Sequence, residues 1–198
     1  SEDWRALARR GGFPTPALEP ETARERAIWF DGYVRTYLER DLQDLAAISA
    51  LPDFRRLMRV ACLRLGQLVN QTELGRDAAL PQATVHRWLN LLEASYLLVR
   101  LPAFAVNRTK RLIKSPKIYL TDSGLACHLL GIETPPELEK SPFLGALFEG
   151  FVAAEIVKLH GAKTAVSAIF DVADENSVKE FVAKTAAEFG QIDILVNN

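Results

Sequence analysis

The chain has 198 residues, of which 48% are hydrophobic and 25% charged, a composition typical of a soluble globular protein with a substantial core. It contains no apolar run of the roughly 18 to 20 residues that a membrane-spanning helix needs and no N-terminal signal pattern, so we expect a cytoplasmic protein. The net charge of -1 hides an uneven distribution of charge along the chain. Residues 54–117 hold 12 Lys and Arg against 3 Asp and Glu, a local balance of +9. Either a polyanion partner or a solvated basic face would explain this excess of positive charge.

The first predicted elements lie in residues 1–50. Repeated glycines and prolines between residues 11 and 20 predict an ordered loop or linker. Thr22 and Glu25 then have the spacing of a capping box, and apolar residues recur at intervals of three and four as far as Leu45. This part of the chain is therefore expected to form a loop followed by an N-terminal helical segment.

A helix starting at Pro52 is predicted next, and two further helices follow at about residues 72–78 and 82–95. Only three residues separate the last two, which is the spacing of a helix-turn-helix. Gly75 lies where the two helices would cross. Ala79 stands where this turn usually has a glycine, and a left-handed backbone there costs a residue with a side chain about 1 kcal/mol.

The second of these helices carries polar side chains on the face opposite its apolar residues. They are Gln82, Thr84, His86, Arg87 and Asn90. Arginine, glutamine and asparagine can each make paired contacts with base edges, so this face could read a major groove. For His86 a purely solvated role is the alternative.

Two strands, at residues 96–101 and 117–121, flank a basic loop. Its candidate phosphate contacts are Arg108, Lys110, Arg111 and Lys114. The order of helices and strands predicts a winged helix-turn-helix over residues 51–122, whose wing would lie against phosphates. Winged helices also dock partner proteins, so the sequence leaves DNA binding and docking both open.

Five motifs carry a resemblance to a known family. They are GGFP at 11–14, YLERD at 37–41, WLNLLEA at 88–94, KSPKIY at 114–119 and TDSGL at 121–125. With them, residues 4–160 resemble the C-terminal region, of unknown function, of bacterial and archaeal AAA-family ATP-binding proteins. The resemblance implies an ATPase module before this region and a nuclease-like domain after it, of which residues 123–160 would be the truncated start.

No complete catalytic site is expected. A phosphate-binding loop of the form GxxxxGK[ST] is absent, so the chain should not hydrolyse ATP. Glu149 matches the acidic position of the nuclease-like domain, but a Glu-x-Lys partner is missing, which favours a structural role. Cys62 and Cys127 fall in apolar helical patterns and are expected to be buried free thiols, and no metal site is predicted.

The last part of the chain, residues 161–198, changes character. Strands at 165–172 and 192–196 around a helix at 174–189 predict a βαβ unit. This stretch resembles the central part of short-chain dehydrogenases/reductases. In that family the residue matching Asp171 contacts the adenine of the cofactor, and Asn197 begins a segment beside it. The glycine-rich turn and a Tyr-x-x-x-Lys pair are missing, so neither hydride transfer nor a cofactor is expected.

The sequence as a whole predicts an α+β chain, mainly helical, with a winged helix-turn-helix followed by a short βαβ fragment. The expected activity is non-catalytic: binding of double-stranded DNA, or docking of a partner such as an upstream ATPase module. A fragment of an NAD(P)-dependent short-chain reductase is the alternative.

Overall fold

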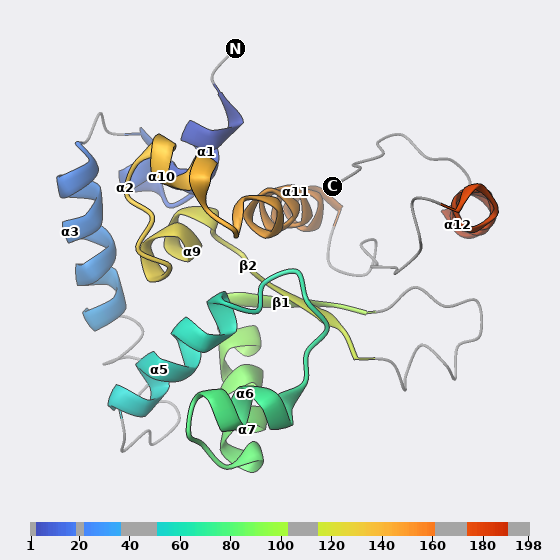
Figure 1. Ribbon diagram of the computed structural model, residues 1–198. Helices are drawn as coiled ribbons and strands as arrows, with labels where there is room; N and C mark the ends of the chain where they lie inside the picture. The colour runs from blue at the N-terminus through green and yellow to red at the C-terminus, as the bar shows by residue number, and fades with distance from the viewer. Residues whose placement is uncertain (1–2, 19–21, 37–50, 103–114, 161–173, 190–198) are drawn as a thin grey trace.

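The computed structural model of the chain describes residues 3–18, 22–36, 51–102, 115–160 and 174–189. In these residues the chain is mainly helical and holds one two-stranded antiparallel sheet, which confirms the predicted α+β class (Figure 1). One cluster of buried side chains includes Phe30 from the N-terminal part of the chain, Phe54 and Leu89 from its middle, and Leu147 from further along the sequence. Segments far apart in the sequence therefore share a single core.

The N-terminal segment contains two short helices, α1 (Trp4–Arg10) and α2 (Pro14–Leu18). The loop predicted for residues 11–20 is wrong over α2. The prolines misled the prediction, because a proline in the first turn of a helix has no backbone N–H to leave unpaired and its fixed φ suits the helix. Asp3 caps α1, where its side chain accepts a hydrogen bond from the backbone N–H of Arg5 at 3.1 Å.

The GGFP and TDSGL motifs meet in space, which explains their glycines. Asp122 precedes α9 (Ser123–Leu129) and accepts hydrogen bonds from the backbone N–H of Gly12 at 2.7 Å and of Leu125 at 2.8 Å. A Cβ atom at Gly11 would lie 2.4 Å from the Asp122 carboxylate, and one at Gly124 would lie 2.8 Å from the Arg10 carbonyl oxygen. The two turns can approach so closely only without side chains.

The capping box predicted at Thr22 is confirmed at the start of α3 (Ala23–Tyr33). The Thr22 backbone N–H donates to the Glu25 carboxylate at 2.8 Å, and the Glu25 N–H donates to the Thr22 hydroxyl at 3.2 Å. The backbone N–H and the hydroxyl of Thr22 both donate to the Glu25 carboxylate, which lowers the pKa of Glu25. Phe30 is buried on α3 and its ring stacks on His128 of α9, so α3 and α9 lie side by side.

The three helices predicted in the basic region are present as α5 (Leu51–Cys62), α6 (Gln71–Asp77) and α7 (Gln82–Ala94). Each buries one apolar face, with Phe54, Leu74 and Leu89 among the fully buried side chains. Asn70 caps α6, since its side-chain oxygen accepts from the N–H groups of Thr72 and Glu73. The predicted boundaries agree with the structure to within a few residues.

The sheet consists of β1 (Leu98–Leu101) and β2 (Lys117–Leu120), paired with Leu98 opposite Leu120 and Leu101 opposite Lys117. The segment before α6 lies along the other edge of β2. Leu68 forms an isolated antiparallel bridge with Lys117, and the N–H groups of Gly66 and Val69 donate to Ile118 and Pro116 at 3.0 and 2.8 Å. The sheet is thereby tied to the chain between α5 and α6.

After α9 the chain forms α10 (Pro135–Lys140), α11 (Leu144–His160) and α12 (Glu175–Phe189). The helix predicted at 174–189 is confirmed as α12, and none of residues 174–187 is buried. Both strands predicted around it lie outside the described residues, so the βαβ unit stays a prediction. Across the described ranges, no helix is both long and apolar enough to cross a bilayer.

Candidate nucleic-acid interface

The turn between α6 and α7 has the geometry that the sequence predicts for a helix-turn-helix. A Cβ atom at Gly75 would lie 2.7 Å from the carbonyl oxygen of Leu80, so only glycine permits this contact between the helices. Ala79 has a φ of 51°, the left-handed conformation expected at the position that usually holds glycine. The Leu80 N–H then donates to the Gly75 carbonyl oxygen at 2.8 Å and closes the turn.

The turn presents one face of α7 outward. Val85, Trp88 and Leu89 are buried against the core. Of the predicted reading residues, four are exposed and Thr84 is half-buried; the exposed ones are Gln82, His86, Arg87 and Asn90. The structure therefore brings all five together on one helix.

A chain of polar contacts crosses this face. His86 Nδ1 lies 3.3 Å from the side-chain oxygen of Gln71 on α6, and His86 Nε2 lies 3.0 Å from the side-chain nitrogen of Asn90. Arg100 of β1 donates from Nη1 to the Asn90 side-chain oxygen at 2.8 Å and pairs with Glu93 at 3.2 Å. The contacts link α6, α7 and the first strand.

The contact with Arg100 indicates which groups donate and which accept in this series of hydrogen bonds. Because Arg100 can only donate, the oxygen of the Asn90 amide faces it and the amide nitrogen faces His86. In this arrangement His86 Nε2 accepts from the Asn90 amide nitrogen and Nδ1–H donates to the Gln71 side-chain oxygen. Both polar atoms of Asn90 make contacts within the protein, whereas Arg87 is exposed on the same helix.

Several cations of the basic stretch tie elements together. Arg64, in the turn after α5, pairs with Asp77 of α6 at 2.6 Å, and this hydrogen bond lowers the pKa of Asp77. Arg56 pairs with Asp53 at 2.7 Å and donates from Nε to the carbonyl oxygen of Ala78. The local balance of +9 already counts Asp77, whereas Asp53 lies just outside residues 54–117, so including the Arg56–Asp53 pair lowers the balance by one.

The basic loop of the predicted wing lies between the two strands and outside the described residues. This applies to Arg108, Lys110, Arg111 and Lys114. Asp171 and Asn197, the residues that match cofactor contacts of the reductase family, also lie outside them. These site predictions stay predictions.

Glu149 of α11 has a structural environment. Its carboxylate pairs with Lys117 Nζ of β2 at 2.6 Å and lies against Gly66, where an added Cβ atom would be 3.1 Å from the carboxylate oxygen. Burial, together with this nearby carboxylate, raises the pKa of Tyr119. The contacts support the structural role that the sequence favours for Glu149.

The expectation of buried free thiols is confirmed. Cys62 and Cys127 are both free and buried, and burial raises the pKa of each to about 12. A thiol with such a pKa is protonated near neutral pH and is therefore a poor nucleophile. Among the described residues, no group of three or more His, Cys, Asp or Glu side chains has the geometry of a metal site.

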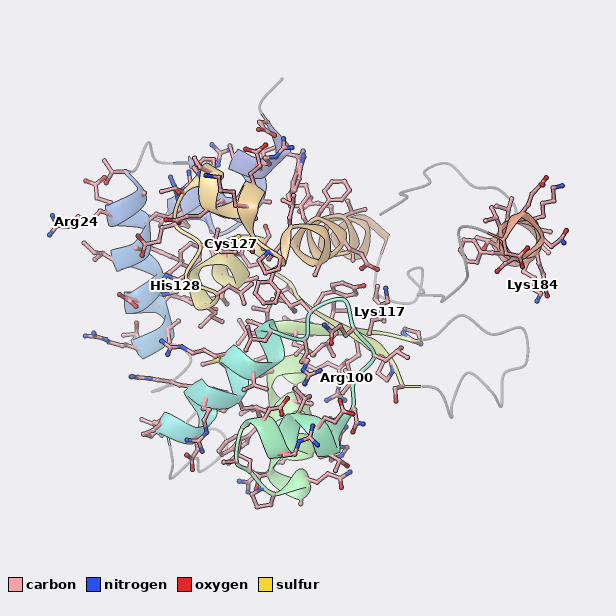
Figure 2. All side chains as sticks on the ribbon, viewed as in Figure 1. Arg24, Arg100, Lys117, Cys127, His128 and Lys184 are labelled. Carbon is pink, nitrogen blue, oxygen red and sulfur yellow. The ribbon has the colours of Figure 1, made fainter. Side chains whose placement is uncertain are left out.

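Sequence reasoning missed Gln71 and Arg100 as partners of the polar face of α7. The four-residue spacing of His86 and Asn90 could have indicated their contact, because such residues are neighbours on a helix. Arg100 lies ten residues beyond Asn90, after the α7–β1 turn, so only the folded arrangement brings it there. Figure 2 shows Arg100 and Lys117 near one another and away from His128, which lies beside α3.

Comparison with known proteins identifies a family for this chain but no activity. The chain is 38% identical over 150 residues to the "Uncharacterized protein Rv2008c" of Mycobacterium tuberculosis and, to the same degree, to the "Uncharacterized protein Mb2031c" of Mycobacterium bovis. The match covers 76% of this chain and 34% of each relative, so the chain spans about a third of the relatives' length. No solved structure matches it. Residues 1–136 match a domain of unknown function, DUF8612, and the chain belongs to this family.

Proposed function

We propose that this chain is a non-catalytic, DNA-binding region of a longer ATP-binding protein. In this proposal α5, α6 and α7 form the helical part of a winged helix, and β1 and β2 form the base of its wing. The proposed activity is binding of duplex DNA, with α7 in the major groove.

The observation that carries the proposal is the outward polar face of α7 on a helix-turn-helix scaffold. Gly75 and Ala79 fix the angle between α6 and α7, and the buried Trp88 and Leu89 hold the back of α7. The order of elements supports the winged form, since the bridge of Leu68 with Lys117 joins the chain before α6 to the second strand. The basic residues between the strands would then reach the phosphates.

Arg87 is the principal candidate for base reading. It is exposed, and a guanidinium can donate to both O6 and N7 of a guanine. Gln82, exposed in the first turn of α7, is a second candidate. Asn90 already contacts His86 and Arg100 through its side chain, which leaves one N–H and one oxygen lone pair of the amide for a base contact and makes it a weaker candidate than Arg87.

The longer protein is proposed from two facts. The mycobacterial relatives are about three times as long as the part that this chain matches. Residues 4–160 resemble the C-terminal region of AAA-family ATP-binding proteins. This resemblance points to an ATPase module as the partner in the longer protein. The reductase-like resemblance of residues 161–198 supports no competing activity, because the Tyr-x-x-x-Lys pair that the chemistry needs is absent from the sequence.

Fluorescence anisotropy with random and selected duplexes tests the proposal. Arg87→Ala should weaken binding to the preferred site by about 1 to 3 kcal/mol and binding to random DNA much less, because a base contact discriminates between sequences. Arg24→Ala removes the same charge from an exposed position on α3 and should leave the preference unchanged. Equal losses for both variants would show that Arg87 contributes charge alone.

Docking of a partner protein is the second candidate, and one residue favours it. Tyr96, between α7 and β1, is 85% exposed and holds a left-handed φ of 57°. Large exposed aromatic side chains are typical of protein interfaces. If the protein bound neither duplex at about 50 mM salt, where electrostatic attraction is strong, the basic face would be better explained as a docking surface.

A further inference from the structure

His86 lies in the middle of the polar contacts on α7, and its two ring nitrogens have partners of opposite kinds. Nδ1 faces the side-chain oxygen of Gln71, which can only accept, at 3.3 Å. Nε2 faces the side-chain nitrogen of Asn90, which can only donate, at 3.0 Å. A ring that donates at Nδ1 and accepts at Nε2 carries one proton, so the two contacts together suit the uncharged form of the imidazole.

A second proton on the ring would break this arrangement. It would place an N–H at Nε2 opposite the N–H groups of the Asn90 amide, and two donors repel one another. The amide cannot relieve the conflict by turning over, because its oxygen accepts from Nη1 of Arg100 at 2.8 Å and a guanidinium can only donate. Glu93 in turn holds Arg100 at 3.2 Å. Protonation of His86 should therefore separate its ring from Asn90.

The elements that form these contacts carry charged side chains of both signs: Arg100 on β1, Arg87 and Glu93 on α7, and Glu73, Arg76 and Asp77 on α6. Their carboxylates pair with arginines, that of Glu93 with Arg100 and those of Glu73 and Asp77 with Arg64. Among the described residues, no carboxylate pairs with the ring of His86. A charged His86 would therefore add one more cation to the exposed face that holds Arg87.

We propose that His86 makes the DNA contact of α7 sensitive to pH, an inference that rests on the proposed DNA-binding function. In its uncharged form the ring is tied to Asn90 and adds no charge to the face. When the ring gains a proton, it leaves Asn90, turns outward beside Arg87 and contacts a phosphate of the DNA. The Asn90 amide then regains an N–H for a base contact. Histidine suits this role because its side chain ordinarily changes charge between pH 5 and 8.

The test measures binding of the full chain to a random duplex by fluorescence anisotropy at pH 7.5 and pH 5.5, at equal ionic strength. We expect affinity to rise about tenfold on acidification, the effect of one added charge-assisted contact. The slope of log K against log salt should steepen by about 0.9, the value for one further phosphate contact. In the DNA-free protein, NMR should show the imidazole of His86 and the side-chain amide of Asn90 titrating with the same midpoint.

Matched variants assign the effect to one ring. His86→Gln cannot take up the proton and should bind equally at both pH values. His86→Lys carries the charge at both and should bind at pH 7.5 about as tightly as the unchanged protein does at pH 5.5. His128→Gln is the control, because His128 lies on α9 beside α3, and this variant should keep the whole pH effect. Thermal unfolding at both pH values shows whether each variant is folded.

The possible failures point to different conclusions. Equal binding by the unchanged protein at both pH values would overturn the pH effect and leave DNA binding intact. A folded His86→Gln that kept the full pH effect would do the same, because another group would then be responsible. No binding at either pH would overturn the DNA-binding function, and the role of His86 with it.

Discussion

Gly75 and Ala79 control the approach of α6 to α7 in different ways. Gly75 provides space, because an added methyl group would meet the backbone carbonyl of Leu80 at 2.7 Å and a backbone atom cannot rotate away. Ala79 sets the direction of the chain between the helices, because its left-handed φ of 51° makes a sharp turn there. The left-handed conformation of Ala79 costs about 1 kcal/mol, which the buried contacts on both sides of the turn offset.

Gly75→Ala is expected to lower the free energy of unfolding by about 1 to 3 kcal/mol, the cost of forcing a methyl group into a packed contact. Gly32→Ala is the matched control, because Gly32 also lies in a helix but has nothing within 4 Å of its added Cβ atom. This second change should raise stability by about 0.5 to 1 kcal/mol. Urea unfolding of both variants measures the difference, and a neutral Gly75→Ala would show that the helices can separate without loss.

His128 should make stability depend on pH. Burial lowers its pKa below the ordinary value of 6.5, and this outweighs the opposite effect of the Asp31 carboxylate. On acidification, the unfolded chain therefore takes up a proton at His128 near pH 6.5, whereas the folded chain takes it up only at a lower pH. Stability should fall as the pH drops from 6.5 toward the folded-state pKa and should change no further below it on account of this residue.

NMR titration of His128 in the folded and urea-unfolded protein gives both pKa values directly. Urea unfolding between pH 7.5 and 5.5 gives the matching change in stability, and His128→Gln should reduce that change. A folded-state pKa above 6.5 would mean that the ion pair with Asp31 dominates, and the stability would then rise rather than fall on acidification.

At the level of elements, the basic stretch divides into two kinds of cation. Arg64 and Arg56 hold α6 to α5, and Lys117 holds β2 to α11, each through an acidic or carbonyl partner. The pairs of Arg64 and Arg56 are partly exposed and contribute little stability singly, whereas the Lys117–Glu149 pair is more buried. In each case the main effect is to fix where elements lie. Arg87 and the basic loop between the strands are the cations that the proposed function uses for contact with DNA.

The predicted wing allows a test of how DNA binding depends on salt. Replacing Arg108, Lys110 and Arg111 by alanine removes three proposed phosphate contacts, so the slope of log K against log salt should become shallower by about 2.7, at about 0.9 per contact. A control replaces three exposed cations elsewhere: Arg24, Lys140 and Lys179. Anisotropy at several salt concentrations measures both slopes. An equal change in both proteins would show that total charge, rather than the wing, attracts the DNA.

The predictable part of the fold was the part encoded locally. Periodic apolar residues and a capping box predicted α3, α5, α6, α7 and α12, and the three-residue spacing between α6 and α7 predicted their turn. The contacts of Arg100 with Asn90 and of His128 with Asp31 were missed, because each depends on side chains from elements that meet only in the folded chain. Helix α2 was missed because prolines at a helix start resemble those of a loop.

At the scale of the whole molecule, the segments before, within and after the basic region share their core. Phe30 of α3, Leu57 of α5 and Leu125 of α9 belong to one cluster of buried side chains, which also includes Leu147 of α11. Removing any of these helices would expose apolar surface on the others. We therefore expect residues 3–160 to unfold together, as one cooperative unit.

The last prediction concerns the tail, residues 161–198. Within α12 none of residues 174–187 is buried, and the shared core draws its members from residues 30–147. A chain that ends at Leu159 should therefore keep the cooperative transition, with a midpoint within about 2 °C of the full chain, equivalent to less than about 1 kcal/mol at this size. A chain that ends at Lys140 loses the buried Leu147 together with α11 and should unfold at a clearly lower temperature or without a sharp transition. Calorimetry of the three proteins compares them directly. If the first truncation behaved like the second, the tail would have to pack against the core, and the two sequence resemblances that meet near residue 160 would belong to one folding unit.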